Sequence, residues 1–191
     1  MNNTIVDSDK LFLVTDLPGY SPQIGRLICM MNYVRFVTLQ SVKELTTKEL
    51  DYLMDEQSNS IGALLLHIAS TDFYFQKLSF ENRELTDEEF KVWQAAAKLG
   101  EQGRKEIRGN DLNYYIEKLN EVRNRTYELM KEKDDKWLET RIPFGKLESN
   151  YYHLWFHVFE DEINHRGQIN LIKKRALGQN SPRRSDATTT T

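Results

Sequence analysis

The chain has 191 residues, of which 39% are hydrophobic and 29% are charged, and it carries a formal net charge of −3. These fractions are typical of a soluble globular protein, and no apolar run approaches the roughly 18 residues that a membrane-spanning helix needs. The acidic balance gives no electrostatic basis for nucleic-acid binding, and the single cysteine, Cys29, excludes an internal disulfide. The stretch MNNTIVDSDKLFLVTD lacks the basic start of a signal peptide, so we expect a cytoplasmic protein with neither nucleic acid nor membrane as a partner.

The first half of the chain predicts two long helices. Residues 1–20 have weak periodicity and end in the turn-forming sequence LPGY, so we expect an N-terminal arm there. Ser21 is a suitable N-cap before a proline, and apolar residues at helical spacing continue from there to about Leu45. Ser60 is a suitable N-cap for a second helix of roughly five turns, which contains His67.

The second half predicts two further long helices. A long polar stretch, residues 80–109, predicts a crossover that contains one short helix. Asp111 is a suitable N-cap for the third long helix, whose apolar residues form a clean stripe to Met130. The charged residues of this helix, Arg123 among them, are expected to form a solvated face. A loop with a brief extended piece leads to the fourth helix, and residues 178–191 have the composition of a disordered tail.

The fourth predicted helix, from Ser149 to Leu177, contains an unusual row of polar side chains. With Ser149 as its N-cap and three cations in its last turn, the stretch has the end signals of one helix. His157, Asp161 and His165 recur every four residues and therefore lie on one side of this helix. Large apolar residues border the row, and polar groups are costly to bury among such residues unless they have partners.

Four long amphipathic helices without a convincing strand pattern predict an all-α fold. The expected architecture is a four-helix bundle with a long crossover between its second and third helices. The last helix carries large apolar groups on further faces, including Trp155, Phe156 and Ile163. A helix that is apolar on most sides is either central or covered by a partner, so we expect a homodimer that uses this helix or the first.

The polar row has the residue types of a metal site. Side chains at i and i+4 lie roughly 5–6 Å apart, which suits two ligands of one ion. Asp161 and His165 form such a pair, as do His157 and Asp161, and His67 is the histidine outside this helix that could complete the set. Three such ligands leave an open position for water or substrate, and they suit zinc, nickel, iron or manganese. The alternative is a buried hydrogen-bond network of histidine and aspartate without a metal.

Three stretches of the sequence resemble one protein family. The run DEINHRGQI, from Asp161 to Ile169, resembles the last helix of the DinB/YfiT-like metalloenzymes. SIGALLLHIASTDFYF and MNYVRFVTL are similar to the second and first helices of that family. The resemblance implies that residues 21–177 form one four-helix-bundle domain, frequently dimeric, with one divalent transition metal held by three side chains. Their positions fall on His67, Asp161 and His165, and Asp161 stands where many members have histidine.

The resemblance also implies what the site would do. Known members include transferases and isomerases that use low-molecular-weight thiols. We therefore expect a metal-dependent enzyme that acts on a small molecule, a thiol-dependent transferase before a hydrolase, with zinc or nickel before iron or manganese. The alternative of another class is a non-catalytic dimeric bundle with a buried polar network, acting as a stress-associated binding protein.

The residues around the expected ligands receive weaker assignments, and none is identified as catalytic. His157 is expected next to the ligands or as a substitute ligand, and Glu162 is expected to orient His165 or to face solvent. Two more residues, Arg166 and Gln168, follow His165 closely and are expected to contact a carboxylate, a ligand or backbone. A substrate pocket is expected beside the ligands, lined by aromatic groups such as Tyr74 and Trp155.

Overall fold

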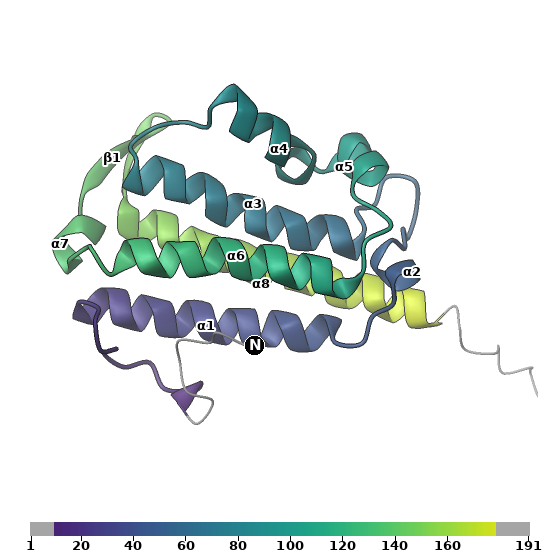
Figure 1. Cartoon of the computed structure of the whole chain (residues 1–191), viewed down its shortest axis with the longest axis horizontal. Coiled ribbons are helices and arrows are strands. Elements are labelled where there is room, and N and C mark those ends of the chain that lie inside the picture. The colour runs from purple at the N-terminus through teal and green to yellow at the C-terminus, as the bar shows by residue number, and fades with distance from the viewer. Residues whose placement is uncertain (1–9, 179–191) are drawn as a thin grey trace, which may run out of the picture.

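The computed structural model describes residues 10–178, in which four long helices run alongside one another as a bundle (Figure 1). These helices are α1 (Pro22–Val42), α3 (Ile61–Phe80), α6 (Leu112–Met130) and α8 (Tyr151–Gly178). α3 packs against both α6 and α8, while α1 packs against α8 and less extensively against α6. The predicted all-α four-helix bundle is confirmed. Residues 1–9 of the expected arm and residues 179–191 of the expected tail lie outside the described residues.

Shorter elements connect the long helices. They are α2 (Thr47–Leu50), α4 (Asp87–Lys98), α5 (Gly100–Glu106), α7 (Asp135–Leu138), β1 (Arg141–Phe144) and β2 (Leu147–Asn150). The crossover contains two helices rather than the one predicted, because the backbone turns at Leu99 and Gly100, where φ is +53° and +61°. The helix α4 packs along α3, as Figure 1 shows. Within residues 10–178, no helix is long and apolar enough to cross a membrane.

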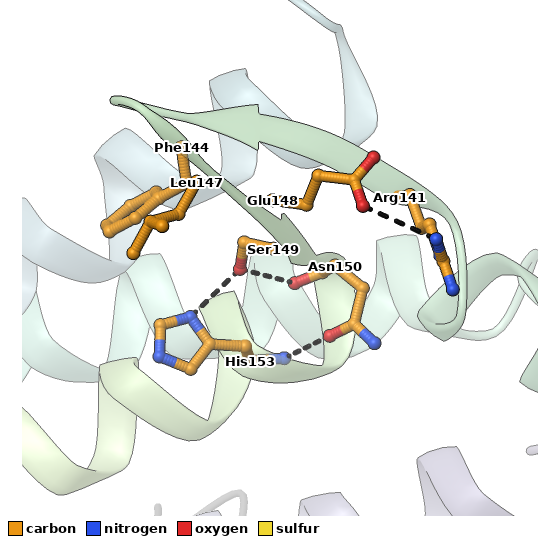
Figure 2. A pocket seen from close by; sticks show the side chains of 7 residues that line it. All are labelled: Arg141, Phe144, Leu147, Glu148, Ser149, Asn150 and His153. Carbon is orange, nitrogen blue, oxygen red and sulfur yellow. Dashed lines mark hydrogen bonds and ion pairs between the residues drawn. The ribbon is translucent and has the colours of Figure 1, made fainter.

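The extended piece predicted before the last helix is an antiparallel hairpin of β1 and β2, in which Arg141 pairs with Asn150. Figure 2 shows the hairpin beside the first turn of α8, where the ring of Phe144 lies 5.8 Å from the ring of His153. Ser149, the predicted N-cap, lies in β2 instead, with its Oγ 3.0 Å from Nδ1 of His153. The side chain of Asn150 caps α8, since its Oδ1 accepts from the backbone N–H of His153 at 2.9 Å.

The first long helix is capped from a distant part of the chain. Ser21 occupies the N-cap position as predicted, but its side chain donates to Oδ1 of Asp135 rather than capping the helix. The same oxygen accepts from the backbone N–H groups of Gln23 at 3.0 Å and Ile24 at 3.4 Å. A carboxylate at this position satisfies two N–H groups that lack helical acceptors and complements the positive end of the helix dipole. Asp135 therefore fixes α7 against the start of α1.

Charged side chains lie in the centre of the bundle. Glu162 of α8 is fully buried, and its carboxylate accepts from Arg35 of α1 at 2.9 Å and from Arg123 of α6 at 3.0 Å. Arg123 also donates to Asp72 of α3, so the four residues connect all four long helices. The prediction that Arg123 faces solvent was wrong, because 3% of its surface is exposed. Glu162 was expected near His165 or in solvent, and it contacts these two guanidinium groups instead.

Replacing Glu162 by glutamine should destabilise the fold strongly. The substitution keeps the shape of the side chain but leaves the buried guanidinium of Arg35 without a carboxylate partner and that of Arg123 with Asp72 alone. We expect a loss of about 3–5 kcal/mol in the free energy of unfolding, measured by urea denaturation. The matched control is Glu117→Gln on the exposed side of α6, which should change this free energy by about 0.5 kcal/mol or less. Equal stability of the two variants would contradict a structural role for the network.

Candidate metal centre

The three predicted ligands come together where α3 packs against α8. His67 lies on α3, and Asp161 and His165 lie one turn apart on α8. One ligand atom from each residue can be chosen so that all three lie within 4.8 Å of one another. Nε2 of His165 is 3.3 Å from Oδ1 of Asp161, and Nε2 of His67 is 3.8 Å from Oδ2 of the same carboxylate. The two imidazole rings meet edge to face, with centroids 4.6 Å apart.

The crossover helix α4 sets the orientation of the His67 ring. Nδ1 of His67 lies 2.9 Å from the backbone carbonyl oxygen of Ala96. A carbonyl only accepts, so Nδ1 carries the proton and Nε2 presents its lone pair toward Asp161 and His165. Metal-binding histidines commonly donate their second N–H in this way, which fixes the tautomer and the ring orientation. No sequence pattern indicates this contact, because the acceptor is a backbone atom in the crossover.

The electrostatics of the cluster favour the protonation states that a metal requires. Burial lowers the pKa of His67, and the neighbouring His165 lowers it further, so the neutral imidazole is favoured. Burial on its own would raise the pKa of Asp161, but the hydrogen bond to His165 and the nearby imidazole groups outweigh this effect and lower it. A neutral imidazole and an ionised carboxylate are the forms that bind metal ions.

Two buried polar atoms of the cluster have no hydrogen-bond partner in the described part of the chain. They are Oδ2 of Asp161 and Nδ1 of His165. Buried polar groups are rarely left without partners, because their lost hydration is not replaced. Two imidazoles and one carboxylate form a donor set suited to zinc, nickel, iron or manganese. The residues therefore fit a divalent metal ion, and a set of three leaves coordination positions open to a further ligand.

A cavity of about 290 Å³ adjoins the cluster. The side chains that line it come from α3, α8 and the end of α4, and they are His67, Ser70, Thr71, Tyr74, Phe75, Ala97, His157 and Asp161. Tyr74 was expected in this pocket and lies there. Trp155 was also expected there, and that prediction was wrong, since its ring is fully buried against Phe80 with centroids 5.5 Å apart.

The remaining predicted site residues lie in different surroundings. His157 lines the cavity, and its Nδ1 lies 3.2 Å from a carboxylate oxygen of Glu160, a contact that the i, i+3 spacing could have suggested. Arg166 is half-buried, and its Nη1 has no hydrogen-bond partner among residues 10–178. Gln168 is exposed on α8. Glu162, turned into the bundle centre, lies behind the cluster rather than in it.

Comparison with known proteins assigns the family. The model of the mycothiol-S-transferase family matches residues 26–178, which includes all four long helices almost completely. The chain belongs to the mycothiol-S-transferase family. This family is DinB/YfiT-like, so the resemblance drawn from the three sequence stretches is confirmed. A search of curated proteins gave no match.

Metal binding should depend on the charge of Asp161. Asp161→Asn keeps the side-chain shape but removes the negative charge, and we expect the affinity for Zn²⁺ to fall by at least about tenfold. Asp161→His, which restores the residue that many DinB/YfiT-like proteins have, should retain binding, and His67→Ala should abolish it. Competition with a chromophoric chelator measures each affinity, and elemental analysis of untagged wild-type protein identifies the resident metal.

The control for this series is His153→Ala, which removes an exposed histidine of the same helix two turns before Asp161. Its Zn²⁺ affinity should equal that of the wild type. Wild-type protein that contains no metal and fails to bind added Zn²⁺, Ni²⁺, Fe²⁺ or Mn²⁺ would leave a hydrogen-bonded histidine–aspartate cluster and exclude a metal centre.

Proposed function

We propose that this protein is a metal-dependent S-transferase that joins a low-molecular-weight thiol to a small electrophilic molecule. The observation that carries the proposal is the cluster of His67, Asp161 and His165 beside a cavity of about 290 Å³. Its family supports thiol chemistry, because the matching family is that of the mycothiol-S-transferases. We further propose that zinc or nickel is the resident metal and that the protein acts in the cytoplasm, where low-molecular-weight thiols are reduced.

The residues of the chain have distinct parts in this reaction. His67, Asp161 and His165 would hold the ion, which supplies a positive charge that lowers the pKa of a thiol. Phe75 and Tyr74 form an aromatic wall of the cavity, which limits the access of water to the reacting groups.

We propose that His157 takes the thiol proton. It lines the same cavity, and because the Glu160 carboxylate accepts from its Nδ1, its Nε2 is left as an acceptor. In the transfer, the thiol sulfur forms a bond to carbon of the electrophile, and the leaving group departs with its bonding electron pair. The thiol proton passes to Nε2 of His157 and then to solvent.

Conjugation of a thiol to 1-chloro-2,4-dinitrobenzene tests the proposal. A panel of low-molecular-weight thiols with metal-loaded protein should include at least one whose conjugation exceeds the uncatalysed rate, followed by absorbance. His67→Ala and Asp161→Ala should lower this rate by about 100-fold or more, since each removes a ligand. Asn170→Ala, on the exposed side of α8, is the matched control and should retain the full rate.

The same assay separates the competing functions. Turnover of ester or amide substrates without any thiol would identify a hydrolase instead, because a bound ion also lowers the pKa of water. Metal-loaded protein that accelerates neither reaction with any member of the panels would contradict the enzyme proposal. A metal-free protein whose stability does not respond to chelator would favour the non-catalytic bundle.

We also propose that the protein forms a homodimer. Large apolar side chains remain exposed on α8 and α1, with exposed fractions of 46% for Phe156, 39% for Ile163 and 42% for Tyr33. Apolar side chains of this size on long helices are typical of surfaces that pair. Light scattering at micromolar concentration should give twice the chain mass of 22.5 kDa, and Phe156→Glu should reduce it to that of one chain. A monomeric mass for the wild type would exclude the dimer.

A further inference from the structure

The turn between α4 and α5 has an unusual backbone. The N–H of Leu99 still bonds to the carbonyl oxygen of Ala95 at 3.1 Å, as it would in a continuing helix. Leu99 then adopts a φ of +53°, which residues with a side chain rarely adopt, and Gly100 begins α5. Gly100 adopts its own positive φ freely, whereas Leu99 does so at a cost. A contact from outside α4 is therefore needed to hold this turn.

Asn59 makes that contact. Its Oδ1 accepts from the backbone N–H of Gly100 at 3.1 Å, across 41 positions of the sequence. In an α-helix each N–H bonds to the carbonyl oxygen of the residue four positions earlier. If α4 continued without a break, the N–H of Gly100 would therefore bond to Ala96. Asn59 takes this donor away from Ala96.

The carbonyl oxygen of Ala96 is used by the candidate metal centre instead. It accepts from Nδ1 of His67 at 2.9 Å, which leaves Nε2 of the same ring free to bind an ion. The last carbonyl groups of a helix have no partner within that helix, so the end of α4 at Lys98 makes this oxygen available. A helix that continued through Gly100 would use the oxygen internally and cover it with its next turn.

Asn59 is well placed to set this geometry because it is joined directly to the helix that carries His67. It precedes Ser60, the N-cap of α3, whose Oγ accepts from the backbone N–H of Ala63 at 3.1 Å. Ser60 is buried, so the start of α3 is held firmly. The end of α4 is thus fixed on α3 by two contacts, one through Asn59 and one through His67.

A second acceptor competes for the ring proton of His67. Nε2 of His67 lies 3.8 Å from Oδ2 of Asp161, so in the other tautomer Nε2 would carry the proton and turn it toward that carboxylate. A protonated ring nitrogen has no lone pair to offer an ion, so this tautomer would block the site. The hydrogen bond to Ala96 is what favours the tautomer that can bind an ion.

We propose that Asn59 is a positioning residue for the candidate metal centre. By accepting from Gly100, it keeps the carbonyl of Ala96 free to hold His67 in the tautomer whose Nε2 can bind an ion. Its effect passes through the backbone of α4. The inference deepens the proposed function, and it rests on that function only for the use that is made of the bound ion.

The tautomer of His67 in the metal-free protein is the first measurement. The ¹⁵N chemical shifts of the two ring nitrogens, recorded at about pH 8 where histidine is mostly neutral, report which nitrogen carries the proton. The wild type should show the proton on Nδ1, and so should Asn59→Asp, whose carboxylate keeps the acceptor. Asn59→Ala should show a mixture of both tautomers, because the carbonyl of Ala96 no longer holds the ring.

The affinity for Zn²⁺, measured by competition with a chromophoric chelator, is the second measurement. Asn59→Ala should weaken it by about tenfold, as is typical when the support of a metal ligand is lost, and Asn59→Asp should retain it. The matched control is Arg104→Ala, which removes a second hydrogen bond between α5 and the segment before α3, from Nη1 to the carbonyl oxygen of Gln57 at 3.0 Å. It loosens α5 without touching Gly100, and it should change neither the tautomer nor the affinity.

Asn59→Ser replaces Asn59→Ala if that variant fails to fold. Its shorter side chain carries the oxygen too far from Gly100, so both measurements should change in the same direction. An unchanged tautomer and affinity in the folded variant, or equal changes in Arg104→Ala, would overturn the proposal. A protein that binds no Zn²⁺ but changes the tautomer of His67 in Asn59→Ala would uphold the role of Asn59 while refuting the metal centre. The expected Zn²⁺ affinities without any thiol transfer would uphold it while refuting the transferase.

Discussion

The buried carboxylate of Glu162 is the constraint on which the arrangement of the bundle depends. It accepts from Arg35 of α1 and Arg123 of α6, and Arg123 also reaches Asp72 of α3. Burial on its own would raise the pKa of Glu162, but the two guanidinium groups outweigh this effect and lower it. The two positive and two negative charges neutralise one another. Burial of the network is therefore energetically acceptable only when all four helices bring their charged residues together. Alternative helix pairings would leave an unpaired charge in the core, which is far more costly than an imperfect apolar contact.

The same constraint positions the candidate metal cluster of His67, Asp161 and His165. Successive residues of an α-helix point about 100° apart, so fixing Glu162 toward α1 and α6 turns its neighbour Asp161 toward α3. His165 follows one turn later on the same side, and the two meet His67 there. Glu162, which forms the ion pairs, and the pair of Asp161 and His165 thus lie on two faces of α8. The ion pairs in the bundle centre fix the rotation of this helix about its axis. A site held by packed helices keeps its geometry better than one carried by loops.

The sequence predicted the long helices and the meeting of His67, Asp161 and His165 because both depend on local spacing. The row of histidine and aspartate at intervals of four residues, together with His67 on another apolar helix, left few ways to assemble three ligands. Arg123 was misplaced because a charged residue between apolar ones has the same pattern whether it faces solvent or a buried partner. The cap of α1 by Asp135 joins residues more than 110 positions apart, and no local signal reports such a contact. Trp155 was placed in the pocket because periodicity cannot say which of several apolar faces packs inward.

The crossover has a structural role that its polar sequence does not indicate. A direct connection between α3 and α6 would leave the outer side of α3 open, whereas α4 covers it and stacks Trp93 on Phe73 with ring centroids 5.3 Å apart. In that position the carbonyl of Ala96 fixes the tautomer of His67, and Ala97 closes one side of the cavity. The capping box of Thr86 and Glu89 starts α4 at a defined residue, so the position of that carbonyl along α3 is defined as well. The long polar stretch therefore contributes to the candidate metal site, because it determines which nitrogen of His67 is free to bind an ion.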